Sequence, residues 1–152
     1  MGRRDFPNRR SVSIIQQTAA IATPPTASAR GLAQACRCAQ VAEEMRGQNT
    51  LVLDLTKVTP IVDYFVVTTG ASNRQMRSLA EEVSRVLKEQ GSRRLGVEGG
   101  SGNSWILYDY GDIVLHVFDA QSRALYDLEH LWADAPRIDW KAQLADGSPR
   151  HA

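Results

Sequence analysis

The sequence predicts an α/β fold in which a mixed sheet of about five strands is flanked by helices. Short segments rich in β-branched and aromatic residues alternate with longer stretches whose apolar residues recur at helical spacing. A strand, a tight turn, a helix and another strand follow one another within 63–97, which indicates a βαβ unit and a parallel pair of strands. Turn-forming residues at 109–112 join two further strands as a β-hairpin. Together these features predict a layered α/β domain.

The first predicted elements are a helix over 32–46 and a strand over 50–55. The apolar stripe of the helix consists mainly of small residues, so the helix can lie close to a sheet, and Gly47 ends it. Pro60 cannot donate a backbone hydrogen bond, so the segment around it is a connection and not a central strand. The next strand is predicted over 63–69.

A second helix is predicted directly after that strand. Ser72 is a good N-cap, and Gln75, three residues later, completes a capping box. Gly91 provides the stop, and a short strand is expected over 94–97.

The hairpin strands are predicted over 104–108 and 113–118, with Gly111 free to adopt a positive φ in the turn. The second of these strands is apolar at nearly every position, so both of its faces should be covered. A single helix is expected over 121–132. Its apolar face is predicted to comprise Ala124, Leu125, Leu128, Leu131 and Trp132.

Both ends of the chain are expected to lie outside the domain, which is predicted to cover 31–135. Residues 1–30 are rich in Arg, Ser and Thr, and we expect a disordered tail. Such a segment is also similar to an organelle transit peptide, which would place the protein in an organelle matrix. We prefer a bacterial tail and a cytoplasmic protein. A polar C-terminal tail is expected over 136–152, with Ile138 and Trp140 as the last candidates for packing contacts.

Composition narrows the class of protein. The 152 residues are 43% hydrophobic and 23% charged, and no apolar run approaches the ~20 residues that span a bilayer. Cys36 and Cys38 lie two apart in a predicted helix and point away from each other, so neither a disulfide nor a zinc site is expected. Five arginines and one aspartate give residues 1–30 a charge of +4, and 13 bases and 16 acids give the rest −3. A mildly acidic domain argues against direct, sequence-specific nucleic-acid binding.

The hairpin and the helix after it form the most acidic stretch of the chain. Residues 95–134 hold seven acids and one base, which gives −6 in a chain whose total is +1. Trp105, Tyr108 and Tyr110 lie among these charges, a pattern that suits docking onto a basic partner. The residues alone favour a simpler interpretation, in which Trp105 and Tyr108 pack in the core and the acids form a solvated rim.

Three features could suggest catalysis, and none forms a complete site. Gly70–Ser72 at a helix N-terminus lacks the lysine and the spacing of a P-loop. Asp109 and Asp112 flank a turn, and Asp54 and Asp63 are the only other plausible metal ligands, so solvated turn residues or partner contacts are the simpler interpretation. His116 lies in an apolar strand, where a core histidine is the simpler interpretation. We expect no catalytic, cofactor-binding or metal-binding residues; a nucleotidyltransferase with Asp109 and Asp112 as metal ligands is the enzymatic alternative.

Several blocks of residues match a known pattern in order and spacing. The blocks are Asp63–Val67, Thr69–Gln75, Val97–Gly99, Trp105–Phe118 and a helical block with Arg123, Tyr126, Leu128, Glu129, Leu131 and Trp132. In this arrangement they resemble the ribosomal silencing factor (RsfS, or Iojap) family over roughly 32–135.

The resemblance implies a ribosome-associated factor that is not an enzyme. Members of this family bind the large ribosomal subunit through ribosomal protein L fourteen and prevent joining of the small subunit, which lowers translation when nutrients are scarce. Organellar relatives act in large-subunit assembly, which is the alternative function. The implied fold is similar to that of nucleotidyltransferases, without their active site.

The resemblance also implies a partner-binding surface on the hairpin. Its residues here are Trp105, Leu107, Asp109, Tyr110 and Asp112. Trp105 is expected to fill a pocket of the ribosomal protein, while Asp109 and Asp112 meet its Lys or Arg groups.

Four further residues match the family pattern, either with a structural role or as a second part of the contact face. They are Asp63, Tyr126, Glu129 and Trp132. Arg123 has carboxylates nearby and is expected to hold its helix through an ion pair. Exposed sheet edges and aromatic faces also allow a homodimer.

Overall fold

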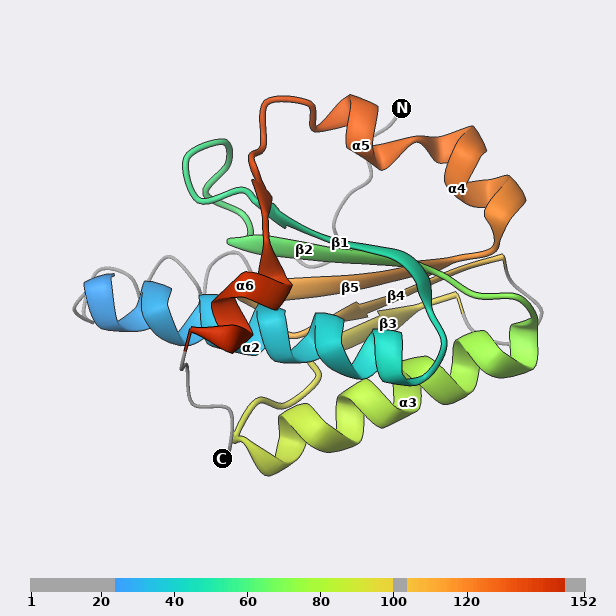
Figure 1. Cartoon of the computed structure of the whole chain (residues 1–152), viewed down its shortest axis with the longest axis horizontal. Coiled ribbons are helices and arrows are strands. Elements are labelled where there is room, and N and C mark those ends of the chain that lie inside the picture. Colours follow the sequence, from blue (N-terminus) through green and yellow to red (C-terminus); the bar gives the residue numbers. More distant parts are fainter. Residues whose placement is uncertain (1–23, 100–103, 147–152) are drawn as a thin grey trace.

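The computed structural model describes residues 24–99 and 104–146, which form a six-stranded mixed sheet flanked by helices (Figure 1). The strands are β1 (Gln48–Asp54), β2 (Tyr64–Thr69), β3 (Gly96–Glu98), β4 (Trp105–Asp109), β5 (Ile113–Phe118) and β6 (Arg137–Ile138). The helices are α2 (Pro24–Glu44), α3 (Asn73–Glu89), α4 (Ala120–Tyr126), α5 (Leu128–Leu131) and α6 (Trp140–Ala145). The predicted fold class is confirmed, with one strand more than expected.

The strand order is β3-β4-β5-β2-β1-β6, and β2 with β5 is the parallel pair in this sheet. The βαβ prediction is therefore wrong in one respect, because β4 and β5 lie between β2 and β3. The apolar character of β5 explains its place, since all six of its residues are buried and both faces must be covered. β3 has three residues with mostly exposed side chains and lies at an edge.

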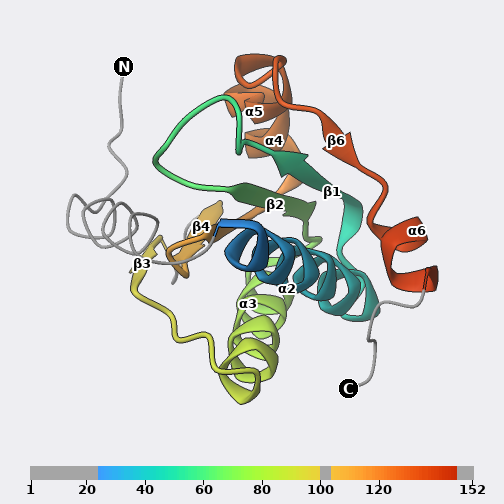
Figure 2. The same ribbon diagram turned by 90° about the vertical axis from the view of Figure 1, so that its left-hand side faces the viewer.

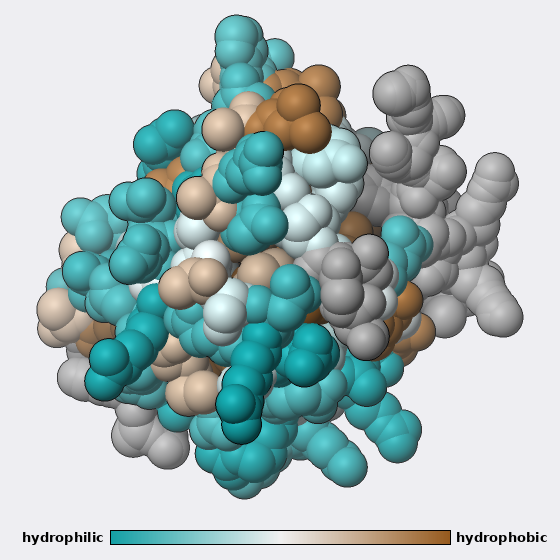
Figure 3. All heavy atoms as spheres, turned by 90° about the vertical axis from the view of Figure 1, so that its right-hand side faces the viewer, coloured by the Kyte–Doolittle hydropathy of each residue, from teal (hydrophilic) through white to brown (hydrophobic). Residues whose placement is uncertain are grey.

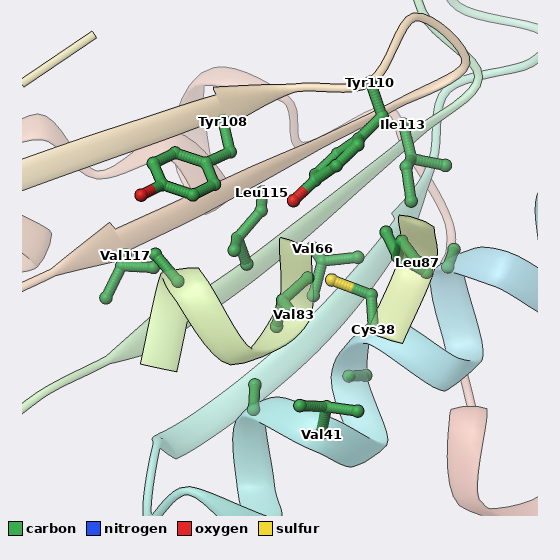
Figure 4. Packing of buried hydrophobic residues seen from close by; sticks show 14 of the residues in the cluster. Cys38, Val41, Val66, Val83, Leu87, Tyr108, Tyr110, Ile113, Leu115 and Val117 are labelled. Atoms are coloured by element: carbon green, nitrogen blue, oxygen red, sulfur yellow. The ribbon is translucent and has the colours of Figure 1, made fainter. Parts of the chain in front are cut away.

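The two faces of the sheet are covered unequally. Helices α2 and α3 lie side by side on one face, whereas the short helices α4 and α5 lie on the other (Figures 1 and 2). The larger hydrophobic cluster fills the space between the sheet and α2 and α3, where Val66, Leu115, Val83 and Cys38 pack together (Figure 4). Both cysteines are buried and free, as their spacing predicts.

The smaller cluster lies on the face that α4 and α5 cover. Phe65 and Phe118 are its largest fully buried side chains, and Trp105 and Trp132 pack against it while staying partly exposed. Trp105 and Phe118 are directly opposite each other in the β4–β5 ladder, which places them on this same face. Trp105 is therefore supported by the smaller cluster while part of its side chain remains exposed.

The predicted helix over 121–132 is two helices. Asp127 adopts a left-handed conformation with φ 47° and ends α4, and α5 begins directly after it. Aspartate tolerates this conformation better than most residues. The break changes which side chains are buried, because Leu128 packs into the smaller cluster while Leu125 and Leu131 of the predicted apolar face are exposed.

The packed part of the chain extends past the boundary predicted at residue 135. β6 pairs with β1, and α6 packs against α2 (Figure 2). Trp140 is buried in the larger cluster, and its indole Nε1 donates a hydrogen bond to the carbonyl of Thr50 at 3.1 Å. The predicted polar tail is therefore wrong for 136–146.

At the other end, α2 begins at Pro24, before the predicted start at residue 32, and the rest of the predicted 1–30 tail lies outside the described residues. None of the helices in the described part of the chain has the length and apolar character that crossing a membrane requires.

Candidate functional site

The predicted partner-binding residues fall into two groups at opposite ends of β4. Trp105 begins this strand and Asp109 ends it, so the two backbone positions are separated by four residue steps, or about 13 Å. The first group lies beside the β4–β5 turn and comprises Asp109, Tyr110, Asp112 and Asp63. The second lies at the Trp105 end of β4 and comprises Trp105, Tyr126 and Glu129. Trp132 instead packs on Phe65, which the strand register aligns with Val114. Leu107 lies between the two groups and is buried in the smaller cluster.

At the turn, Asp109 and Tyr110 face inward. Asp109 is 5% exposed, and its carboxylate accepts a hydrogen bond from the backbone N–H of Gly111, which has the positive φ expected of it. Tyr110 is 7% exposed and its ring points into the larger cluster (Figure 4), where burial raises the pKa of its hydroxyl. These two side chains shape the turn and fill the core, so neither has the free surface that a partner contact needs.

Asp112 and Asp63 lie beside the same turn and close to Asp54. The backbone N–H of Asp63 donates to the carbonyl of Asp112 at 2.9 Å, which ties the start of β2 to the turn. Burial, together with the negative charges of Asp112 and Asp54, raises the pKa of Asp63 to about 6. Among the described residues, no group of three or more His, Cys, Asp or Glu side chains could hold a metal ion.

At the opposite end of β4, Trp105 is held in an aromatic stack. Its indole stacks on Phe118, with centroids 5.0 Å apart at 26°, and Tyr126 from α4 covers it at 4.6 Å. The indole Nε1 donates a hydrogen bond to Nδ1 of His116 at 3.1 Å. Trp105 is partly buried and Tyr126 is 48% exposed, so the stack continues from the core to the surface.

His116 lies beneath this stack, in the middle of β5. It is fully buried, and the loss of hydration lowers its pKa to about 3, so the imidazole is neutral near pH 7. Its ring also lies at an angle of 74° to Phe65, with centroids 4.4 Å apart. The expectation of a core histidine is confirmed, but its bond to Trp105 was not expected from the sequence.

The pKa values of His116 and Asp63 are shifted in opposite directions, so their effects on the free energy of unfolding partly cancel as the pH falls. Between about pH 6.5 and about pH 3, unfolding lets His116 take up a proton, so stability falls on acidification by about 1.4 kcal/mol per pH unit. Asp63 opposes this, because its raised pKa stabilises the fold below its unfolded pKa, and that stability is lost as pH rises through about 6. We expect Asp63→Asn to lose stability more steeply than wild type from about pH 6 to about pH 4, measured by chemical denaturation. Parallel stability profiles would contradict these assignments.

Arg123 holds α4 and α5 together across the break at Asp127. Its guanidinium donates to the carboxylate of Glu129 at 2.9 Å and to the hydroxyl of Thr69 at 2.9 Å. Burial would raise the pKa of Glu129, but the hydrogen bond and charge of Arg123 outweigh it and hold that pKa below its usual range. The ion pair expected of Arg123 is confirmed, and Glu129 is a structural partner inside the fold.

Replacement of Arg123 should destabilise the protein measurably. We expect Arg123→Gln to lower the free energy of unfolding by about 2 kcal/mol, because it leaves a partly buried carboxylate without its charged donor. Arg85→Gln is the matched control, since Arg85 also forms ion pairs, with Glu82 and Glu89, but does so in solvent. Denaturant midpoints compare the two, and equal effects would show that burial of the Arg123 pair contributes nothing.

The two helices that carry Tyr126 and Glu129 also expose large apolar side chains. Leu125 is 74% exposed and Leu131 is 69% exposed, and with Tyr126 and Trp105 they form what we call the α4–α5 surface. Figure 3 shows hydrophobic side chains (brown) near the top of the face it presents, at the level of α4 and α5. Trp132 packs mainly inward, with its ring 5.8 Å from Phe65 and nearly perpendicular to it.

Exposed acidic side chains occur between α4 and α5, after α5 and on β3. Asp127 and Asp134 are exposed, and Glu98 of β3 lies opposite Leu107, on the same sheet face as Trp105. Arg123, the one Arg or Lys in residues 95–134, is bound to Glu129. Leu125 and Leu131 were missed as surface residues because helical spacing placed them on a buried face, and only the break at Asp127 exposes them.

Comparison with known proteins identifies relatives over most of the chain. Residues 26–152 match the family model described as ribosomal silencing factor during starvation. The ribosomal silencing factor RsfS of Halalkalibacterium halodurans is 35% identical over 103 residues, which are 68% of this chain and 88% of that protein. A mouse protein named for mitochondrial assembly of the ribosomal large subunit is 28% identical over 107 residues, which are 66% of this chain and 47% of that protein.

A solved structure agrees with these sequence matches. A crystal structure of a Chromobacterium violaceum protein aligns with a TM-score of 0.61 and 38% sequence identity, and covers 63% of this chain and 80% of that one. The family match extends over much more than half of the sequence, and the family is named for ribosome silencing and not for a reaction. The chain therefore belongs to the ribosomal silencing factor family.

Proposed function

We propose that this protein binds the large ribosomal subunit through ribosomal protein L fourteen and blocks joining of the small subunit, which represses translation when nutrients are limiting. The observation that carries this proposal is the α4–α5 surface, where an aromatic stack and two exposed leucines lie among acids. Large exposed apolar side chains with a polar border are typical of protein-binding surfaces. No cofactor enters this function, and we propose that it is exercised in the cytoplasm.

The charge of the region suits a basic protein partner. Of the acids behind the −6 of residues 95–134, Glu98 lies on the sheet face that carries Trp105, and Asp127 is exposed between α4 and α5. Ribosomal proteins are basic, so acids at the border would speed association and make it depend on salt. The apolar centre would supply most of the affinity.

Within that centre, Trp105 can make only apolar or cation–π contacts with a partner, through the carbon atoms of its ring. Its one polar atom, Nε1, is already bonded to His116. A partner would therefore contact the exposed edge of the ring with aliphatic groups or with a Lys or Arg stacked on it. We propose that the contact is centred on Trp105 and Tyr126, bordered by Asp127 and Glu98.

The test of the partner is direct binding to purified ribosomal protein L fourteen. We expect the full-length protein to retain it in a pull-down at low salt, and to retain less of it as salt rises. Absence of binding at any salt concentration, with folded components, would overturn the choice of this partner.

Large-subunit assembly is the second candidate function, and the name of the mouse relative favours it. The same surface would then hold an immature particle. Sucrose-gradient profiles after deletion of the gene distinguish the two functions, because assembly predicts accumulation of immature large subunits. Silencing instead predicts normal subunits that join more readily during starvation.

A further inference from the structure

We propose that His116 is a positioning residue for Trp105, fixing the orientation in which the indole is presented to a partner. This inference rests on the proposed function of the α4–α5 surface. It begins from the hydrogen bond between Trp105 Nε1 and His116 Nδ1, at 3.1 Å, which joins a partly exposed side chain to a fully buried one. The two residues come from neighbouring strands, where the β4–β5 register places Trp105 opposite Phe118 and Leu107 opposite His116.

The hydrogen bond selects one orientation of the indole. Stacking on Phe118 and packing of the tilted Tyr126 ring hold the plane of the indole, but a flip of the indole within that plane would keep much of this contact. Only one orientation directs Nε1 to His116, and a flipped ring would leave a partly buried N–H without its acceptor. The bond therefore distinguishes two orientations that stacking alone does not.

His116 is suited to be a constant acceptor. The imidazole is deprotonated at Nδ1 when it accepts this bond, so its proton is on Nε2. Nε2 is buried and has no hydrogen-bond partner in the part of the chain that the structure describes. A buried polar atom without a partner is costly, so an apolar side chain would serve the core better than histidine does. The bond to Trp105 accounts for a histidine at this position.

Indole hydrogen exchange tests the bond in the intact protein. Trp140 Nε1, which donates to the carbonyl of Thr50, is an internal control, and Trp132 Nε1 has no partner among the described residues. In wild type we expect slow exchange for Trp105 and Trp140 and fast exchange for Trp132, with Trp105→Phe assigning the signal. In His116→Phe, which keeps an aromatic ring but has no acceptor, the Trp105 signal should become fast while Trp140 stays slow. In His116→Asn, whose amide oxygen can replace Nδ1, Trp105 should be slow again.

Binding to isolated large subunits then tests the functional role. We expect His116→Phe to weaken binding about fivefold to tenfold, the effect of having to order one free side chain on association. The same change made in Trp105→Ala should have almost no further effect, because His116 would act only through Trp105. An equal loss in both backgrounds would mean a general effect on the fold and would overturn the proposal.

Two further results would overturn the proposal. The first is fast exchange of the Trp105 indole N–H in wild type. The second is a His116→Phe variant in which this N–H exchanges fast but the affinity for large subunits is unchanged. The proposed function fails separately, if Trp105→Ala itself binds large subunits as tightly as wild type.

Discussion

Replacing Trp105 with alanine should weaken binding to isolated large ribosomal subunits by about thirtyfold, or about 2 kcal/mol, as loss of a central interface tryptophan typically does. The ring is already stacked and hydrogen-bonded before binding, so little freedom is lost when a partner covers it. Its removal also takes away the ring that stacks on Phe118. Titration of labelled protein with purified subunits, at two salt concentrations, measures the change.

The matched control is Asp112→Asn at the other end of the hairpin. Asp112 is partly exposed and belongs to the same acidic stretch, but it lies beside the turn and not beside Trp105. We expect its affinity to stay within about twofold of wild type, because a distant charge affects association weakly. If Asp112→Asn weakened binding as strongly as Trp105→Ala, the contact would have to include the turn. If Trp105→Ala bound normally, the α4–α5 surface would not be the contact.

Replacing Trp140 with alanine should destabilise the protein by about 3–5 kcal/mol. Trp140 is buried in the larger cluster, so truncation leaves a cavity between α6, α2 and the sheet. The hydrogen bond to the Thr50 carbonyl is lost as well. Chemical denaturation of the full-length protein should show a lower midpoint and retained cooperativity.

Lys141→Ala is the control for that prediction. Lys141 neighbours Trp140 in sequence but is exposed, with its ammonium over the Trp140 ring and 3.2 Å from Glu43. Exposed contacts of this kind contribute little, so the midpoint should hardly change. If Trp140→Ala also left the denaturation midpoint unchanged, residues 136–146 would contribute nothing to the stability of the fold.

The parts of the fold that follow from local chemistry are predictable from the sequence. Ser72 accepts a hydrogen bond from the backbone N–H of Gln75, and Gly111 takes its positive φ in the hairpin turn. The apolar run of β5 predicts that it is covered on both faces, and it lies at the centre of the sheet. Each of these features depends on residues within a few positions of one another.

The parts that depend on distant packing are not predictable in this way. Trp140 stands in a polar segment, and its burial depends on a place between α2 and β1 that local patterns do not reveal. Asp127 breaks a stretch with regular helical spacing, which reverses the exposure expected of Leu125 and Leu131.

For the candidate site, the resemblance names both Trp105 and Tyr126, and the structure brings these two rings into contact. It also grouped them with Asp109 and Tyr110, which are near in sequence but turned inward. Trp105 and Asp109 lie at opposite ends of β4. Because the five residues of this strand are extended, its two ends are farther apart than the width of a side chain.

We propose that the protein binds through the α4–α5 surface and thereby blocks subunit joining, and this is tested most directly with purified ribosomal subunits. Small and large subunits are mixed with increasing wild-type protein or Trp105→Ala, and the formation of joined ribosomes is followed by light scattering. Wild type should reduce joining in proportion to its occupancy of the large subunit, and Trp105→Ala should need about thirtyfold more protein for the same reduction. Joining that proceeds normally on large subunits saturated with wild-type protein would contradict the proposed function.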